Sequence, residues 1–400
     1  MFDSIFIGMT GLQGFSKGLK VISNNVTNLN TPGFKGSQLR FADAYYQQSG
    51  LGGGYTLSQP QMQYGTGLAT LAARLNFQPG ETRQTGNGLD LAIAGDGMFV
   101  LHDKESGNEV YSRAGQFEFD KDGDLISGAT GKYVMGYATG SDALSRIALD
   151  GLRTSAAKAT ATVKLVGNLS STATEFNIDS VKLVDAVGGE HLVRLNFKNK
   201  GSTDPGVWTV TVFDGTTSVS TGEIKFVDGQ PDPAQNALNF SYTPSGGTAF
   251  SVKLDLSKDV TSFAAGTTSS LAVSSQDGFA AGALTGAAID GDGALSLTYS
   301  NGQTAKGARV ALAVFDSNIG LRQLEGGEFV ADGTQTARIG KPGDTGLGTI
   351  ESGQLELSNV DLSSEFSDLI VMQRGYQASS HIVSTANDMI QALFDMKGNR

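Results

Sequence analysis

The chain has 400 residues, a net charge of −11 and no cysteine, and 39% of its residues are hydrophobic. This length predicts two or three domains with packed cores, and its 54 glycines favour turns and short strands. The acidic balance, without any lysine or arginine cluster, argues against nucleic acid or an anionic membrane as a partner. No apolar run approaches the roughly 18 residues of a membrane-spanning helix, and the start lacks the basic region of a cleaved signal peptide.

The first 30 residues have the spacing of an amphipathic helix, with apolar side chains at steps of three and four. Four glycines between positions 8 and 18 each cost such a helix about 1 kcal/mol relative to alanine. We therefore expect the helix to form only when it is packed against a partner. Pro32 and Gly33 should end it. The predicted contact residues are Phe2, Ile5, Met9, Leu12, Leu19, Ile22 and Val26.

Residues 362–397 repeat this spacing, and Asp361 or Ser363 is placed to cap the start of a second helix. Thirty-six helical residues span roughly 54 Å, so we expect this helix to project from the globular body. Its predicted contact residues are Leu362, Phe366, Leu369, Tyr376, Val383, Ile390 and Phe394. Apolar helices at both ends need a cover, and a cover made by further copies of the chain would make it a polymer subunit.

Between the helices the sequence alternates in the manner of β-strands. Residues 31–75 are polar and rich in Gly and Gln, which predicts a linker or extended loop. Hairpins are expected at residues 89–101, turning at 95–97, and at 116–126, turning at 120–123. Residues 294–315 resume the hairpin pattern around a turn at 300–302.

Residues 148–283 carry seven strand-like runs separated by turns, which is typical of an independent all-β domain. The simplest topology is nested. The 148–283 domain is inserted into a discontinuous inner β-domain of residues 76–147 and 284–360, and residues 1–30 and 361–400 form a helical polymerisation domain. The predicted fold class is mainly β with terminal α-helices, whose N- and C-terminal helices pair as a coiled-coil-like layer.

The sequence offers little that points to catalysis. His102, His191 and His381 have no motif around them, so packed or solvated histidines are expected. The acidic turn at residues 120–124 lacks the Gly and Glu of a calcium loop and is predicted to be a hairpin turn. We therefore expect no enzyme activity, no cofactor and no metal site.

Residues 23–35 read Ser-Asn-Asn-Val-Thr-Asn-Leu-Asn-Thr-Pro-Gly-Phe-Lys, a spacing that by itself supports only a helix end followed by a turn. This stretch resembles the signature of bacterial flagellar axial proteins, which are the rod, hook and hook-associated subunits. Residues 85–99, 111–117, 352–363 and 373–378 resemble further parts of that family, in the same order. The matching positions are Asn24, Asn25, Asn28, Thr31, Pro32, Gly33, Phe34, Lys35, Asn359, Gln373, Arg374, Tyr376 and Gln377.

Within this family the inserted 148–283 domain favours a hook subunit, because rod subunits resemble only the outer parts and are shorter. The opening residues and the Pro-Gly pair at 32–33 differ from many hook proteins, and a distal rod or other axial subunit is the alternative. The resemblance implies a helical homopolymer: a flexible, curved tube in the extracellular part of the flagellum that transmits torque to the filament as a universal joint in swimming motility.

The resemblance also implies partners. They are the rod, the hook–filament junction proteins, the hook cap and the flagellar type III export apparatus, which would export the chain without a cleaved signal peptide. Phe41 and Tyr45 resemble the Phe-x-x-x-apolar export element of hook-type substrates, and the alternative for them is a short amphipathic turn. The rival class is a secreted β-rich adhesin or enzyme with helical ends, which would not form tubes.

Overall fold

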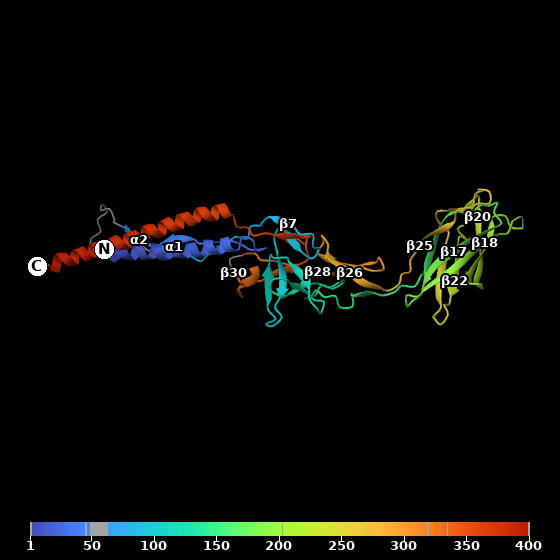
Figure 1. The fold of residues 1–400 in the computed structure, drawn as a ribbon, viewed down its shortest axis with the longest axis horizontal. Coiled ribbons are helices and arrows are strands. Elements are labelled where there is room, and N and C mark those ends of the chain that lie inside the picture. Colours follow the sequence, from blue (N-terminus) through green and yellow to red (C-terminus); the bar gives the residue numbers. More distant parts are fainter. Residues whose placement is uncertain are drawn as a thin grey trace, which may run out of the picture. The chain divides into compact units, whose positions relative to one another are not determined.

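The computed structural model describes residues 2–44, 46–48, 63–201, 203–317, 320–333 and 335–398. These residues divide into two compact units (Figure 1). Unit 1 contains residues 1–149, 287–296 and 306–400, and unit 2 contains residues 150–286 and 297–305. The chain thus leaves unit 1 for unit 2 and returns to it.

The two terminal helices lie side by side in unit 1 (Figure 1). They are α1 (Phe2–Thr27) and α2 (Leu362–Gly398). Asp361 caps α2, since its carboxylate accepts a hydrogen bond of 2.9 Å from the Ser363 N–H. The predicted fold class, mainly β with paired helices at both ends, is confirmed.

Glycines make the contact between the helices, which run antiparallel. A Cβ added at Gly8 would lie 2.7 Å from Val383 Cγ2, and one at Gly11 would lie 2.5 Å from Ser379 Oγ. Further along, a Cβ at Gly18 would meet Met372. The glycines that weaken an isolated helix are therefore the residues that allow α2 to approach.

The strands of unit 1 before residue 149 are β1 (Ser37–Gln38), β2 (Phe41–Asp43), β3 (Tyr46–Gln48), β4 (Gln63–Gly65), β5 (Leu68–Thr70), β6 (Arg74–Leu75), β7 (Thr82–Gln84), β8 (Leu91–Ala94), β9 (Met98–His102), β10 (Glu109–Ser112), β11 (Phe117–Phe119), β12 (Leu125–Ser127), β13 (Tyr133–Tyr137) and β14 (Leu144–Arg146). Those after residue 311 are β29 (Leu312–Val314), β30 (Leu321–Gln323), β31 (Glu328–Ala331), β32 (Arg338–Gly340), β33 (Thr349–Ser352) and β34 (Gln354–Glu356), with a 3-10 turn, η2 (Glu325–Gly327).

The strands of unit 2 are β15 (Thr154–Ser155), β16 (Thr162–Asn168), β17 (Glu175–Val184), β18 (Glu190–Asn199), β19 (Val207–Asp214), β20 (Thr217–Val227), β21 (Gln230–Pro231), β22 (Ala237–Tyr242), β23 (Phe250–Asp255), β24 (Val260–Thr261) and β25 (Ala272–Gln276). Three further strands, β26 (Gly282–Ile289), β27 (Ala294–Tyr299) and β28 (Thr304–Val310), contain residues of both units.

The segment after α1, for which the sequence predicts a linker or extended loop at residues 31–75, forms short antiparallel strand pairs in its described part. Strands β1 and β6, β2 and β5, and β3 and β4 pair in turn. Leu68 and Phe41 from this ladder approach α1 at Gly14, where an added Cβ would lie 2.7 and 3.5 Å from them. The short polar strands lack the apolar alternation by which a strand is recognised in sequence.

Strand β9 is central to the sheet of unit 1, because it pairs with β10, β13 and β29. The predicted hairpin at residues 89–101 was wrong, since β8 pairs with β33 and not with β9. Gly95 and Gly97, with φ of 100° and 133°, redirect the chain between the two pairings. The hairpin at residues 116–126 is confirmed by β11 and β12, and Asp120 Oδ1 accepts three backbone N–H groups in its turn.

Unit 2 is built from two main sheets around one hydrophobic core. One sheet has the order β17-β18-β19-β20-β21, and the other has β22-β23-β16-β24 with β25 beside β16. Alternate residues of β18, namely Val193, Leu195 and Phe197, are buried in this core together with Trp208. The seven strand-like runs predicted for this region are confirmed as β16 to β20, β22 and β23.

No helix among the described residues is long and apolar enough to cross a membrane.

Candidate assembly faces and the junction at the helix roots

The packing of α1 against α2 leaves large apolar side chains exposed on both helices. On α1, Phe6 and Met9 are 58% and 56% exposed, and on α2, Val371 and Phe394 are 60% and 70% exposed. Folding of one chain therefore leaves these apolar surfaces in water, at about 25 cal/mol per Å² of uncovered area. Surfaces of this kind mark places where another molecule binds.

The predicted contact residues divide between the two sides of the helices. Ile22 is buried, and Ile5, Leu12, Leu19, Val26, Leu369, Val383 and Ile390 are partly buried. Met9, Leu362, Phe366, Tyr376 and Phe394 are exposed, and the side chain of Phe2 lies outside the described residues. The heptad pattern missed further exposed apolar residues, which are Phe6, Ile7, Ile370, Val371, Ile382, Met389, Leu393 and Met396.

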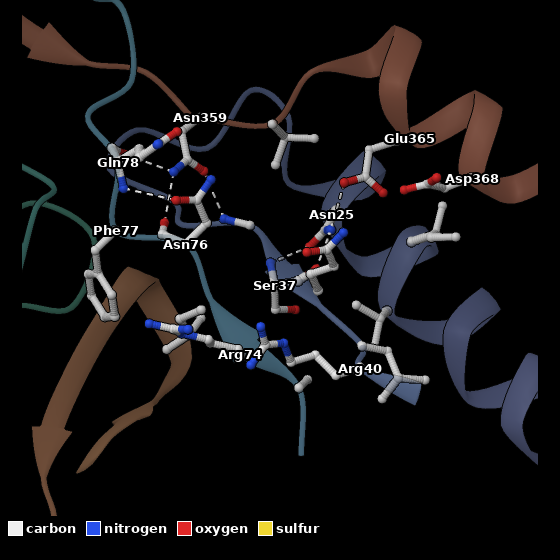
Figure 2. Close-up of a pocket in the computed structure, with 18 of the residues that line it drawn as sticks. Asn25, Ser37, Arg40, Arg74, Asn76, Phe77, Gln78, Asn359, Glu365 and Asp368 are labelled. Atoms are coloured by element: carbon white, nitrogen blue, oxygen red, sulfur yellow. Dashed lines mark hydrogen bonds between the residues drawn. The ribbon is translucent and has the colours of Figure 1, made fainter. Parts of the chain in front are cut away.

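A polar junction joins the C-terminal end of α1 and the N-terminal end of α2, which we call the roots of the helices, to the strands. Asn25 is its first member (Figure 2). The Asn25 amide is buried and donates hydrogen bonds of 2.8 Å to the Ser37 carbonyl and to Glu365 Oε1. Its own oxygen accepts from the Ser37 N–H at 3.0 Å. Burial raises the pKa of the Glu365 carboxyl, with Asp368 and Asp361 adding to the effect, while the bond from Asn25 opposes it.

Asn359 is the second member of the junction. Its Oδ1 accepts from the Gly36 N–H at 2.9 Å, and its Nδ2 donates to the carbonyls of Asn76 and Gln78, both at 2.8 Å. One amide side chain thereby joins the segment after α1, the segment after β6 and the segment before α2 (Figure 2).

Lys35 is the third member, and it is fully buried. Its ammonium group lies 2.5 Å from Glu356 Oε1 and donates to the Gln78 carbonyl at 2.8 Å. Burial lowers the pKa of Lys35, and the attraction of Glu356 opposes that effect. Arg113 Nη1 lies 3.1 Å from the second oxygen of Glu356.

The remaining residues of the 23–35 motif shape the turn out of α1. Asn28 donates to the Asn24 carbonyl at 2.9 Å and accepts from the Thr31 hydroxyl at 3.2 Å. Pro32 is partly buried, and Phe34 is buried beyond it. Gly33 has a φ of 68°, and a Cβ there would lie 2.4 Å from the backbone nitrogen of Ala114, so this position requires glycine.

The C-terminal part of the predicted motif lies elsewhere. Gln373, Arg374, Tyr376 and Gln377 are exposed on α2 and are not part of the junction. The motif thus separates into residues that fix the helix roots and residues that α2 presents to its surroundings.

A groove of about 1340 Å³ opens beside the junction, between the helix roots and strands β1 and β6. Arg40 and Arg74 lie on its strand side, and Glu365 and Asp368 extend from α2 (Figure 2). Among the described residues, no group of three or more His, Asp or Glu is placed to bind a metal ion.

The candidate export element is only partly described. Phe41 lies in β2, is partly buried, and its ring centroid is 6.0 Å from that of Phe15 in α1. Tyr45 lies outside the described residues.

Sequence reasoning missed Glu356, Arg113 and Glu365, which complete the junction. Lys35 and Glu356 are 321 positions apart, and no short-range pattern relates them. Two signals were available: Arg113 and Glu356 lie in the family-like segments 111–117 and 352–363, and Glu356 is a charged residue within an otherwise strand-like run at residues 354–357.

Three protein-family models match parts of the chain. They are the Flagella basal body rod protein model at residues 5–35, the Flagellar hook protein FlgE/F/G D1 domain at residues 92–180, and the Flagellar basal body rod FlgEFG protein C-terminal model at residues 351–396. The first and last of these cover the residues that form the junction on the α1 and α2 sides.

Relatives match over the whole chain. The flagellar hook protein FlgE of Escherichia coli is 30% identical over 97% of this chain and 98% of its own length. FlgE of Borreliella burgdorferi is 29% identical over 99% and 100%, and the basal-body rod protein FlgG of Bacillus subtilis is 25% identical over 99% and 100%. The crystal structure of Helicobacter pylori flagellar hook protein FlgE2 matches with a TM-score of 0.47 at 14% identity, covering 68% of this chain and 99% of that one. By its full-length similarity to FlgE, the chain belongs to the flagellar hook protein family.

Proposed function

We propose that this chain builds a flagellar hook by self-assembly through the helix faces that α1 and α2 leave exposed. Family membership supports a structural subunit of the bacterial flagellum. The observation that carries the mechanism is the set of exposed apolar side chains on two helices that already contact each other, which supports a further cover, and we propose that other copies of the chain supply it.

Copies that cover one another in this way would meet through different surfaces. A head-to-tail interface that does not close into a ring generates a helical filament. The glycine contact between α1 and α2 occupies one face of each helix, and the exposed residues occupy the others. We infer that the large apolar residues of both helices form the packed inner wall of a tube.

The nested course of the chain supports a layered subunit. We propose that the strands of unit 1 form a middle shell and that unit 2, the equivalent of the predicted 148–283 domain, forms an outer one. A tube that bends as a universal joint needs outer contacts that slide, and polar surfaces with weak interfaces allow this.

We further propose that the flagellar type III apparatus exports the chain without cleavage and that it meets rod, junction and cap proteins at the two ends of the hook. Phe41 supports an export role by its place in a segment that follows the first helix. Since Phe41 packs near Phe15 in the folded chain, the export apparatus would read it in the unfolded chain.

Electron microscopy of concentrated protein tests the assembly proposal. Wild type is expected to form tubes, and the double substitution Ile370→Ser and Val371→Ser on α2 to abolish them, because it removes apolar area that faces outward. Leu192→Ser, which removes an equally exposed residue from β18 of unit 2, is the matched control and should leave tubes intact. Tubes from the α2 variant would contradict the proposal.

The similarity to FlgG keeps a rod function as the second candidate. Deleting the gene in the source organism distinguishes the two. Loss of the hook from basal bodies that retain a complete rod supports the hook assignment, and loss of the distal rod supports the alternative.

A further inference from the structure

Glu356 connects three segments that are distant in sequence. It is the last residue of β34, and it is 2% exposed. Oε1 accepts from Lys35 Nζ at 2.5 Å and from the Gly80 N–H at 2.9 Å, and Oε2 accepts from Arg113 at 3.1 Å. Its carbonyl oxygen also accepts from the Gly33 N–H at 2.8 Å. Every oxygen of this residue is therefore used, and together they hold residues 33–35, Gly80 and Arg113.

The three charged side chains lie out of contact with water. Lys35 is 0% exposed and Arg113 is 4% exposed. Arg113 also donates to the carbonyls of Ile93 and Gly95, and Lys35 donates to that of Gln78. Two cations share one carboxylate, and among the residues that the structure describes Glu356 is the one acid paired with either of them. Removing it leaves two buried positive charges, which is more costly than removing one cation.

These residues lie at the roots of both terminal helices. Lys35 follows the end of α1 at Thr27 by eight residues, and Glu356 precedes the start of α2 at Leu362 by six. Arg113 follows β10, in the sheet of unit 1. A buried ion cluster adds little to stability compared with a packed apolar one, whereas its directional bonds specify one geometry.

We propose that Glu356, Lys35 and Arg113 form a clamp that fixes the roots of α1 and α2 to the strands of unit 1 in a single geometry. The clamp is a positioning device, and its residues are positioning residues. The proposal concerns contacts within one chain and does not rest on the hook assignment.

Because the clamp holds two positive charges and one negative charge, its variants should not lose order in proportion to the number of substitutions. Lys35→Met keeps the aliphatic stem and leaves a neutral Arg113–Glu356 pair, so it should loosen the roots little. Glu356→Gln leaves two facing cations and should loosen them strongly. Adding Lys35→Met to Glu356→Gln removes one of those cations, so the double variant should be better ordered than Glu356→Gln alone. A cluster that acted only by filling space would become worse with each substitution.

Amide hydrogen exchange of the full-length, unassembled chain measures this. Glu356→Gln is expected to speed exchange of residues 30–38 and 76–82 by at least about tenfold, the scale of an uncompensated buried charge. Exchange in β9 should stay unchanged, and the double variant should recover part of the protection. The proposal is overturned if the double variant exchanges as fast as Glu356→Gln, or if Glu356→Gln leaves both segments protected.

Glu328→Gln is the matched control. Glu328 is 1% exposed in β31 and binds Thr130 and Lys132, so it is also a buried carboxylate with a lysine partner. It lies outside the clamp, and its loss should speed exchange near residue 130 while residues 30–38 stay protected. If Glu356→Gln does not fold, recovery of folding by the double variant, followed by circular dichroism, gives the same answer. If neither Glu356→Gln nor the double variant folds, the claim that removing one of the two facing cations restores order is contradicted.

Measuring stability at a series of pH values gives a second test, because a purely packing role would not make the effect of the substitution depend on pH. The charged groups that face Lys35 are Glu356 from β34 and Arg113 from the segment after β10. In Glu356→Gln, Lys35 has lost the carboxylate that helps to hold its proton, so its pKa falls further below that of the unfolded chain, and raising the pH neutralises Lys35 in the folded chain first and removes its repulsion from Arg113. The urea midpoint of this variant should therefore approach that of wild type as the pH rises, and a gap that stays constant would overturn the proposal.

Discussion

Gly33 lies where the turn out of α1 approaches the backbone of Arg113 and Ala114. Gly33→Ala meets two costs, the left-handed φ of 68° and a backbone nitrogen 2.4 Å from the new Cβ. Gly86, with a φ of 76° and nothing within 4 Å, meets only the first. We expect Gly86→Ala to lower the free energy of unfolding by about 1 kcal/mol and Gly33→Ala by about 3 kcal/mol or more. Urea denaturation of both variants measures the difference, and equal losses would show that the turn can move.

Glu365, the partner of Asn25 in the junction, allows a test by pH. Burial raises its pKa above the ordinary glutamate value of 4.5, so the folded chain binds a proton at this site more readily than the unfolded chain does. Its ionised form therefore destabilises the fold at pH 7, and this penalty disappears as the pH falls through the raised pKa. Glu365→Gln keeps an acceptor for Asn25 and removes the charge, so its urea midpoint should exceed that of wild type at pH 7 and equal it at pH 4. An advantage that persists at pH 4 would indicate packing and not charge.

At the residue scale, sequence reasoning found one side of each junction contact. The family motif singled out Asn25, Lys35 and Asn359, and all three lie in the junction. Their partners Glu365 and Glu356 are more than 300 positions away, and side-chain geometry alone decides which carboxylate meets which donor.

At the element scale, the existence and limits of both helices were predictable, and the way they pack was not. The spacing predicted helices at residues 2–29 and 362–397, close to α1 and α2. The four glycines of α1 counted against the helix in isolation because propensity describes a helix in water. Tertiary packing reverses their effect, because only a residue without a side chain allows Ser379 and Val383 to come so near.

The short strands between residues 37 and 75 show a second limit of the sequence. They lack apolar alternation, and β1, β2 and β5 lie against α1. At residues 91–102 the alternation correctly predicted strands but not their partners, because β8 pairs with β33 and β9 with β29, both far along the chain.

The helices should differ between free and assembled protein. In a free chain α1 has a glycine-rich contact and exposed apolar side chains, so we expect its amides and those of α2 to exchange rapidly with solvent. Assembly covers the exposed faces, and exchange in both helices should slow by at least about tenfold, since burial of each large apolar side chain contributes about 1.5–3 kcal/mol. Hydrogen exchange of monomers and tubes measures this. Full protection in the monomer would contradict the role assigned to the exposed faces.

At the scale of the whole molecule, unit 2 is a self-contained insertion with its own core. Replacing residues 150–286 with a short Gly/Ser linker should leave tube formation possible, because the helices and the strands of unit 1 are untouched. The stiffness or curvature of the tubes should change, since the outer contacts are gone. Electron microscopy measures both, and complete loss of assembly would contradict the layered arrangement.

The glycine contact between α1 and α2 means that folding and assembly use different residues of the same helices. Gly8, Gly11 and Gly18 specify how one chain folds on itself, and residues such as Phe6 and Val371 are free of that task. The outward residues can therefore change during evolution without disturbing the fold of the subunit. A chain organised in this way can acquire new neighbours by altering its large side chains while its glycines stay the same.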